Sequence, residues 1–246
     1  MAASTHLNGA TSNGTSLATP TDKKVFFFDI DNCLYPKSYQ IHDRMSVLID
    51  KYFQDHLALS AEDATELHQR YYKDYGLAIE GLVRHHKVDP MEYNEKVDDA
   101  LPLDEIIKPN PQLRKLIEDI DHENVKLWLF TNAYKTHGQR VVKLLGIADL
   151  FQGMTYCDYA AGTNLLCKPR PEMYAKAMRD AGVQDVKQCY FVDDSALNAT
   201  GGKAYGWKSA HLVEPQSKAP ATPAADFQIS NLEELRTIYP ELFKTT

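Results

Sequence analysis

Two carboxylates, Asp29 and Asp31, come directly after four apolar residues at positions 25–28. This apolar run predicts a strand buried on both faces, and buried parallel strands bring ligand-binding groups to their carboxyl ends. In an extended chain the side chains of residues 29 and 31 leave the same face, so the carboxylates come close together unless the backbone turns after Asp29. Like charges in such proximity require a cation or a shared proton. The pair therefore predicts cation binding or proton transfer, and the alternative is an acidic turn that caps a strand.

Two further predicted strands, residues 126–132 and 188–194, also end in polar side chains. These side chains are Thr131, Asn132, Asp193 and Asp194. The carboxyl ends of parallel strands face the same way, so these groups are expected to converge with Asp29 and Asp31. Carboxylates from two strands form a site for a hard cation, and Mg²⁺ suits a site that keeps water and takes a phosphate oxygen. Lys168 stands just before a predicted helix and, taken by itself, is typical of a surface residue.

The composition is that of an ordinary globular protein. The 246 residues, 43% hydrophobic and 25% charged, allow one sizeable domain or a core with a smaller insert. A net charge of -7 and the lack of a Lys/Arg run argue against a nucleic acid polymer as partner, but a metal ion and a lysine can make a local site cationic for a small phosphorylated substrate. The four cysteines lack metal-ligand spacing, which indicates reduced thiols and no zinc site. No apolar stretch reaches the roughly 18 residues of a membrane span and no signal segment is evident, so we expect a cytoplasmic location, with the nucleus as a second option, and no membrane insertion.

The pattern of apolar residues divides the chain into three parts. Residues 1–22 are rich in small polar side chains and are predicted to form a disordered tail. Residues 36–108 carry apolar residues at helical spacing and are too long for a simple crossover, so we interpret them as an inserted helical cap. After the cap, helices alternate with short strands, which indicates a parallel sheet. The predicted fold is therefore α/β, with a doubly wound, Rossmann-like core formed by residues 23–35 and 109–246.

The individual elements follow from periodicity and capping signals. The predicted cap helices cover residues 41–52, 61–72 with Ser60 as N-cap, 82–86 and 90–98. The predicted core helices cover residues 111–122, 136–145, 171–181 and 231–238, and two further strands cover residues 153–157 and 207–213. Residues 214–226, rich in Pro and Ala, are predicted to be an extended surface segment.

Four short motifs in this order resemble the haloacid dehalogenase superfamily of aspartyl-phosphate enzymes, over residues 25 to about 213. They are Asp29-Ile30-Asp31, Thr131, Lys168 and Asp193-Asp194. The helical insert is similar to the family's cap domain of the first type. More narrowly, Asp-Ile-Asp-Asn-Cys-Leu-Tyr, Tyr-Gly-Leu-Ala-Ile-Glu-Gly-Leu, Thr-Asn-Ala and Val-Asp-Asp-Ser are similar to stretches of fungal and plant pyrimidine 5′-nucleotidases. Fungal relatives of that group include phosphatases described for lysophosphatidic acid.

The resemblance implies a Mg²⁺-dependent phosphomonoesterase. Asp29 would be the nucleophile that forms an aspartyl-phosphate, and Asp31 would protonate the leaving oxygen and then deprotonate the attacking water. The implied metal-binding residues are Asp29, Asp31 through its main-chain carbonyl, Asp194, and Asp193 either as a ligand or as the support of one. The implied phosphate-binding groups are Thr131, the amide of Asn132 and Lys168. Haloacid dehalogenases usually lack the second carboxylate, so Asp31 favours phosphate chemistry.

The similarity to nucleotidases implies a nucleoside 5′-monophosphate as substrate, with a pyrimidine base in the first instance. Two alternatives stay open: a phosphatase for another small monoester, such as lysophosphatidic acid or a sugar phosphate, or a catalytically idle core used as a regulatory binding module. The core binds the phosphoryl group, which is the same in all monoesters, so selectivity for the leaving group is expected in the cap. The candidates are Tyr75, Gly76 and Gly81, where two glycines allow a tight loop. Tyr75 is a candidate to stack on a base, although the tyrosines at 71, 72 and 75 are most simply the core and rim of the cap.

The first motif departs from its commonest form. Asn32-Cys33 stands where Gly-Thr usually follows the two carboxylates. Asn tolerates a positive φ better than most residues, so we expect the turn to survive. Cys33 is an alternative nucleophile, but no histidine is near it in the sequence, and a buried thiol is the favoured interpretation. Among the histidines, His137 follows the second motif and is a candidate for substrate contact, while the others are expected at the surface or in packing.

Overall fold

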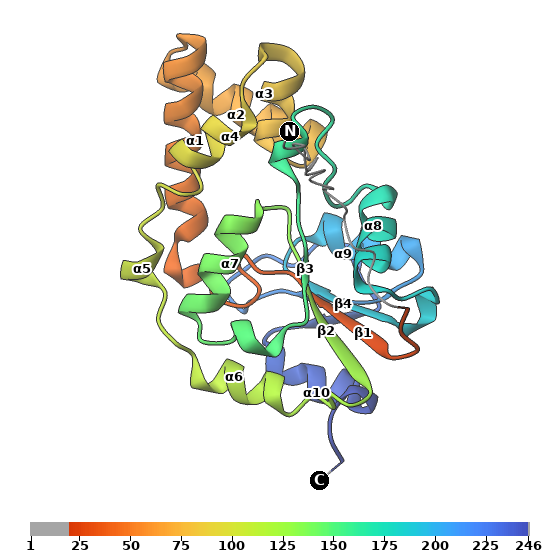
Figure 1. The fold of residues 1–246 in the computed structure, drawn as a ribbon. Helices are drawn as coiled ribbons and strands as arrows, with labels where there is room; N and C mark the ends of the chain where they lie inside the picture. The colour runs from red at the N-terminus through yellow and green to blue at the C-terminus, as the bar shows by residue number, and fades with distance from the viewer. Residues whose placement is uncertain (1–19, 246) are drawn as a thin grey trace, which may run out of the picture.

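The computed structural model describes residues 20–245. Their strands form one parallel sheet in the order β3-β2-β1-β4-β5-β6. The strands are β1 (Lys24–Phe28), β2 (Val125–Phe130), β3 (Met154–Thr155), β4 (Cys189–Asp193), β5 (Lys208–Leu212) and β6 (Phe227–Ile229). The chain winds from the central β1 outward to β3, returns to β4 and continues outward to β6 (Figure 1). This doubly wound arrangement confirms the predicted fold class.

Helices cover both faces of the sheet because side chains alternate along each strand. The core helices are α5 (Leu103–Ile106), α6 (Pro111–Glu118), α7 (Lys135–Leu144), α8 (Pro171–Ala181), α9 (Ala196–Tyr205) and α10 (Leu235–Ile238). Helix α5 lies within the range predicted for the cap, residues 36–108, but Leu103 packs in the core cluster. Phe26 and Phe28 of β1 pack in a buried cluster with α6, α7 and α10. Val25 and Phe27 point to the other face and pack with α8. The apolar run before Asp29 is thus buried on both faces, as predicted.

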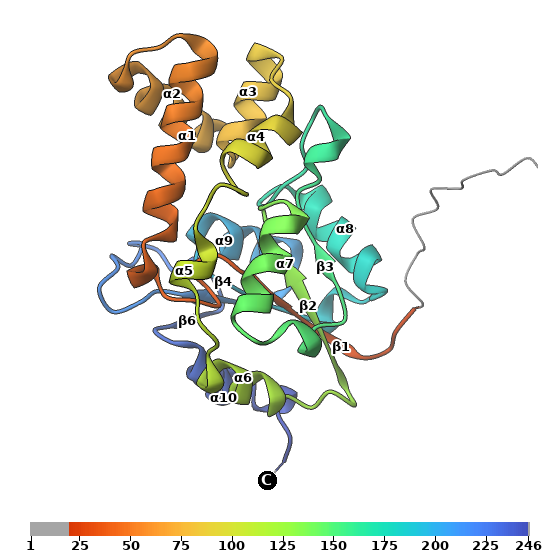
Figure 2. The same ribbon diagram turned by 60° about the vertical axis from the view of Figure 1, so that its left-hand side comes forward.

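The cap stands at the carboxyl ends of the strands (Figures 1 and 2). Its helices are α1 (Ile41–Leu57), α2 (Ala61–Tyr75), α3 (Ala78–His86) and α4 (Pro90–Lys96). The predicted N-cap Ser60 accepts a hydrogen bond from the Asp63 N–H. These helices share a buried cluster that also includes Cys157, Leu165 and Cys167 of the core. Among the described residues, no helix is long and apolar enough to cross a membrane.

The start of the chain, two core elements and one cap helix differ from expectation. Of the predicted tail, residues 1–19 lie outside the described part, and the Thr21 N–H donates to the Gly182 carbonyl at 2.9 Å. Helix α9 was not predicted, because the paired glycines at 201 and 202 weaken its helical pattern. Strand β6 was missed as well, since it has three residues and two of them are exposed. The predicted start of the third cap helix at residue 82 is wrong, because α3 begins at Ala78.

Candidate active site

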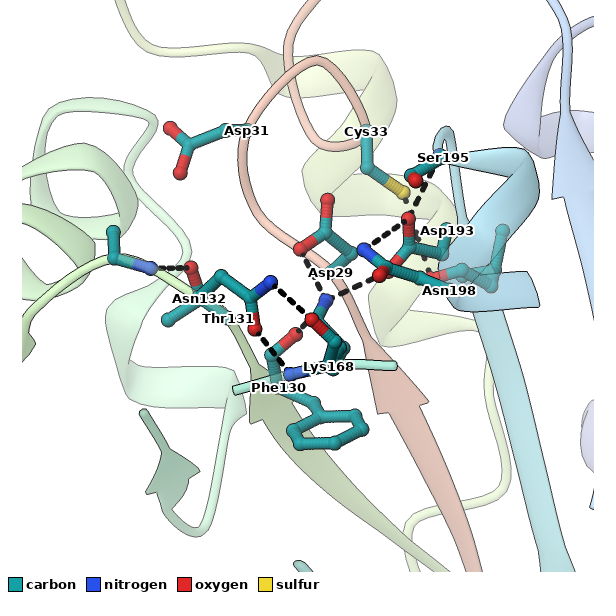
Figure 3. Close-up of polar contacts among 12 residues, drawn as sticks. Asp29, Asp31, Cys33, Phe130, Thr131, Asn132, Lys168, Asp193, Ser195 and Asn198 are labelled. Atoms are coloured by element: carbon teal, nitrogen blue, oxygen red, sulfur yellow. Dashed lines mark hydrogen bonds and ion pairs between the residues drawn. The ribbon is translucent and has the colours of Figure 1, made fainter. Parts of the chain in front are cut away.

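The nucleophile candidate Asp29 lies one residue beyond β1. Its N–H still donates to the Val192 carbonyl of β4, at 3.0 Å, which anchors it to the sheet. The backbone then turns through Asn32, whose φ is +57°, a conformation that Asn tolerates better than most residues. Because of this turn, the carboxylates of Asp29 and Asp31 point in different directions (Figure 3). The backbone therefore turns after Asp29 and keeps the two carboxylates apart.

Lys168 is fully buried and bridges two carboxylates (Figure 3). Its Nζ donates to Asp29 Oδ1 at 2.7 Å, to Asp193 Oδ2 at 2.6 Å and to the Phe130 carbonyl oxygen at 2.7 Å. Burial alone lowers the pKa of this ammonium, but Asp193 and Asp29 outweigh it and hold the pKa of Lys168 well above its usual value. The lysine therefore stays charged beside Asp29, and the interpretation as a surface residue is wrong.

Asp29, Asp193 and Asp194 bring carboxylate oxygens within 4.8 Å of one another. Burial, followed by the charge of Asp193, raises the pKa of Asp29 well above its usual value and raises that of Asp194 to about 6. Mutual repulsion of this kind is relieved by a bound cation. Carboxylate oxygens are the ligands that Mg²⁺ prefers, so the residues present fit this ion.

The two acidic residues that end β4 differ in their surroundings. Asp193 Oδ1 accepts from the Ser195 N–H at 2.8 Å, and both of its oxygens accept from Asn198 Nδ2, at 3.3 and 3.2 Å. With Lys168 also donating to Oδ2, each carboxylate oxygen of Asp193 accepts two hydrogen bonds. Asp194 instead faces Lys37, whose Nζ lies 3.0 Å from Asp194 Oδ2. The geometry therefore favours Asp194 as a direct metal ligand and Asp193 as the group that orients the lysine.

Asp31 lies outside this carboxylate cluster. Its Oδ1 accepts from Tyr35 Oη at 2.7 Å and pairs with His137 Nε2 at 2.7 Å. Burial raises the pKa of Asp31, but His137 and Tyr35 outweigh it and bring the pKa below its usual value, while Asp31 holds the pKa of His137 above its usual value despite burial. Asp98, another buried carboxyl near His137, has its pKa raised by burial to about 7. His137, the candidate for substrate contact, is fully buried and outside the cavity wall, and its Nε2 bonds to Asp31 instead.

Asn132 holds the backbone of Lys168 in place. Its Oδ1 accepts from the Lys168 N–H at 2.7 Å, and its Nδ2 donates to the Lys168 carbonyl at 2.9 Å. This leaves the main-chain amide of Asn132 as its group for a phosphoryl oxygen. Thr131 accepts at Oγ1 from the Ala133 N–H at 3.0 Å, and both Thr131 and Asn132 line the cavity above the strand ends.

A cavity of about 520 Å³ lies between the strand ends and the cap. The core contributes Asp29, Asp31, Thr131, Asn132 and Asp194 to its wall, and the cap contributes Met45, Ile49, His68, Tyr72, Gly76 and Leu77. Of the tyrosine cluster, Tyr72 is the member that lines this cavity, and the field of Asp194 adds to burial in raising its pKa. Tyr75 instead bonds through Oη to His85 Nε2 at 2.8 Å on the exposed side of the cap. The choice of Tyr75 as the stacking ring therefore has no support in this geometry.

The two glycines proposed for a selectivity loop have different roles. Gly76 ends α2 with φ of +82°, and a Cβ at this position would lie 3.2 Å from the Lys168 carbonyl oxygen. Gly81 is not in a loop, and the prediction that it helps to form one is wrong. It lies inside α3, where a Cβ would lie 2.2 Å from Cγ of Tyr71, so this glycine allows α2 and α3 to approach closely.

Cys33 does not have the surroundings of a nucleophile. The thiol is buried and contacts the Val192 carbonyl at 3.8 Å. Burial, with the nearby charge of Asp29, raises the pKa of Cys33 well above its usual value. Reactive thiols have a lowered pKa, so the buried-thiol interpretation is confirmed.

A doubly wound core whose strand-end carboxylates lie under a helical cap is the architecture of a capped α/β hydrolase. The chain belongs to the haloacid dehalogenase-like hydrolases, because the model of that family matches residues 23–206. It is 38% identical over 200 residues to "Phosphate metabolism protein 8" of Saccharomyces cerevisiae, an alignment that covers 78% of this chain and 62% of that protein. The chain thus spans less than two thirds of that relative's length.

Solved structures show the same fold at low sequence identity. A HAD phosphatase from Thermococcus onnurineus is 19% identical with a TM-score of 0.56, over 87% of this chain and 97% of that one. L-2-haloacid dehalogenase from Xanthobacter autotrophicus with chloropropionic acid covalently bound is 15% identical with a TM-score of 0.52, over 89% of this chain and 98% of that one. Since these neighbours differ in reaction, the fold does not decide the chemistry, and the site must.

Proposed function

We propose that the protein is a Mg²⁺-dependent phosphomonoesterase that acts through an aspartyl-phosphate on Asp29 and prefers pyrimidine nucleoside 5′-monophosphates. The observation that carries the proposal is the separation of the two first-motif carboxylates. Asp29 sits in the carboxylate cluster beside Lys168, while Asp31 is held apart by Tyr35 and His137. A dehalogenase has no leaving oxygen to protonate, whereas a phosphatase needs such a second group.

In the first step, a carboxylate oxygen of Asp29 attacks phosphorus and forms a P–O bond as the bond to the leaving oxygen breaks. Asp31 gives its proton to that oxygen, and the leaving group departs as an alcohol. In the free protein one proton is shared by the Asp31–His137 pair and is drawn to the histidine. The negative charge of a bound phosphate opposes ionisation of Asp31 and so raises its pKa, which favours the protonated carboxyl that this step needs.

In the second step, Asp31 takes a proton from water, and the hydroxyl oxygen attacks the aspartyl-phosphate to release phosphate and restore Asp29. Thr131 and the main-chain amide of Asn132 line the cavity at the strand end and hold phosphoryl oxygens. The predicted phosphate contact of Lys168 has no support in this geometry, because Lys168 is fully buried outside the cavity wall and its ammonium donates to Asp29, Asp193 and the Phe130 carbonyl; its charge acts on the site through Asp29. A Mg²⁺ ion held by Asp29, the Asp31 carbonyl and Asp194 would supply positive charge to the phosphoryl oxygens. Asp193 holds Lys168 in place, because its carboxylate accepts from the lysine and is itself fixed by the Ser195 N–H.

The cavity supports a nucleotide as substrate. Its volume of about 520 Å³ is within the range of small-molecule sites, roughly 300–1,000 Å³. Tyr72 offers a half-exposed ring on the cavity wall, and aromatic faces stack readily on bases. The apolar side chains of Met45 and Ile49 also line this wall, so lysophosphatidic acid remains the second substrate to test.

The test is a panel of phosphate esters assayed with Mg²⁺ and with EDTA. We expect turnover only with Mg²⁺ and highest kcat/KM for uridine or cytidine 5′-monophosphate, above a purine nucleotide, a hexose phosphate, lysophosphatidic acid and an aryl phosphate. Asp29→Asn should abolish turnover, and the matched control Asp55→Asn, which changes an exposed carboxylate on α1, should not. Full activity in EDTA or a fully active Asp29→Asn variant would refute the mechanism. A higher kcat/KM for another ester would refute the proposed preference for pyrimidine nucleotides. No turnover on any ester would favour a binding module.

A further inference from the structure

His68 and Tyr72 occupy the same face of α2 and both line the cavity. Residues four apart are neighbours on a helix surface, and one turn advances about 5.4 Å along the axis. Tyr72 lies in the field of the carboxylate cluster, where Asp194, Asp193 and Asp29 each contribute to its raised pKa after burial. His68, one turn earlier, is therefore placed beyond the phosphoryl end of the cavity.

The imidazole of His68 is held in one orientation. Its Nδ1 lies 2.8 Å from Asp50 Oδ1 on α1, and the other oxygen of Asp50 accepts from Thr65 Oγ1 at 2.8 Å. A carboxylate accepts hydrogen bonds, so Nδ1 carries the proton in this pair. The His68 side chain is 12% exposed, and it is the cavity that it faces. This leaves Nε2 as a fixed hydrogen-bonding atom for a ligand.

Apolar side chains of the cap share the cavity wall with His68, and Gln40, His42 and Asp43 line it as well. Met45 and Ile49 of α1 line the same wall, and Phe53 lies beside the imidazole with ring centroids 5.9 Å apart. A hydrogen-bonding atom fixed among apolar groups discriminates strongly, because a ligand that lacks a partner for it leaves a polar group unpaired.

We infer that His68, oriented by Asp50, is a specificity-determining residue that hydrogen-bonds a polar group of the leaving alcohol, and so favours an alcohol that carries such a group over an aryl alcohol that does not. This inference rests on the proposed phosphomonoesterase function. The polar group is a hydroxyl, carbonyl or ring nitrogen that lies about one helical turn from the phosphoryl group. An unsubstituted aryl alcohol offers no such partner, whereas lysophosphatidic acid carries a glycerol hydroxyl and an ester carbonyl near its phosphoryl group.

The experiment compares uridine 5′-monophosphate, lysophosphatidic acid and an aryl phosphate as substrates for His68 variants. His68→Phe keeps a ring and removes Nε2, and we expect kcat/KM to fall about tenfold for the nucleotide and to change less than about twofold for the aryl phosphate, which has no polar group there. The change for lysophosphatidic acid shows whether its glycerol hydroxyl or ester carbonyl also reaches Nε2. His68→Asn keeps a donor for Asp50 but has no atom at the position of Nε2, and it should reproduce this loss if the Phe variant does not fold. His68→Gln places an amide near the position of Nε2 and should retain most of the nucleotide activity.

The matched control is His56→Ala. His56 forms a similar pair with a carboxylate in the same cap, 3.3 Å from Glu92, but outside the cavity wall. We expect all three substrates to keep their ranking in this variant. Equal losses of kcat/KM on all esters in both His68→Phe and His68→Asn would overturn the inference, and so would unchanged nucleotide kinetics in both variants. In either case, turnover by the wild type would leave the proposed function standing. A wild type that hydrolyses no ester would overturn the proposed function and this inference with it.

Discussion

Replacing Lys168 by Met should destabilise the protein and do so in a pH-dependent way. The substitution keeps most of the side-chain volume but removes an ammonium that donates to two carboxylates and a carbonyl. Removing one partner of a buried ion pair leaves an uncompensated charge and costs about 3–5 kcal/mol. Because Lys168 serves both Asp29 and Asp193, we expect the upper part of that range at pH 8.

The sign of the pH dependence follows from Asp29. The pKa of Asp29 is already higher in the folded protein than in the unfolded chain. Ionised Asp29 therefore destabilises the folded state at any pH above the pKa that Asp29 has in the unfolded chain. Loss of the lysine raises this pKa further, and stability is recovered as pH falls and the carboxyl takes up a proton. The recovery is worth about 1.4 kcal/mol for each pH unit of added shift. The variant should therefore be much closer to wild type at pH 5 than at pH 8.

Urea unfolding followed by circular dichroism, in EDTA at both pH values, measures this difference. The matched control is Lys176→Met, which removes a partly exposed lysine that pairs with Asp180 on α8 and should cost less than about 1 kcal/mol. A Lys168→Met variant that loses less than about 1 kcal/mol at pH 8, or whose deficit grows toward pH 5, would refute the reasoning.

Three further predictions concern the second carboxylate and the cap. Asp31→Asn should lower kcat for a nucleotide by about 10²–10⁴-fold but less for an aryl phosphate, which needs little protonation; equal losses on both esters would count against the acid role. His137→Phe, which removes one of the two donors to Asp31, should lower kcat about tenfold with little change in KM, and a change in KM alone would contradict this orienting role. Gly81→Val should lower the urea midpoint of unfolding, at a cost of about 1–3 kcal/mol, because its Cβ would overlap the ring of Tyr71; an unchanged midpoint would show that the two helices can separate freely.

The core of the site could be predicted because it depends on strand ends. An apolar run that ends in carboxylates identifies the strand, and parallel topology then requires Asp29, Thr131 and Asp193 to meet at one edge. The burial of Lys168 could not be predicted from the sequence around it, because a lysine before proline carries no signal of burial. Its position came from the resemblance, and the structure gives the reason in its bridge between two carboxylates.

The cap contacts could not be predicted, because they depend on how the cap is seated on the core. Tyr72 and Tyr75 are three residues apart on α2, so their side chains differ by about 60° around the helix axis. Either could have faced the site, and no local pattern decides between them. Asn198 was missed for a related reason: its contact with Asp193 requires that α9 begin right after the acidic pair, and α9 lacks a clear apolar pattern.

The loop before Lys168 is joined to the cap by a buried hydrogen bond whose proton can be followed in solution. The Leu165 N–H donates to Glu80 Oε2 at 2.7 Å, and this carboxylate of α3 is almost wholly shielded from water. Any hinge motion that lifts α3 from the core must break this bond and expose the proton. The hydrogen-exchange rate of the Leu165 amide therefore reports how often the cap opens. It can be measured without substrate, and it detects openings too rare for a static structure to record.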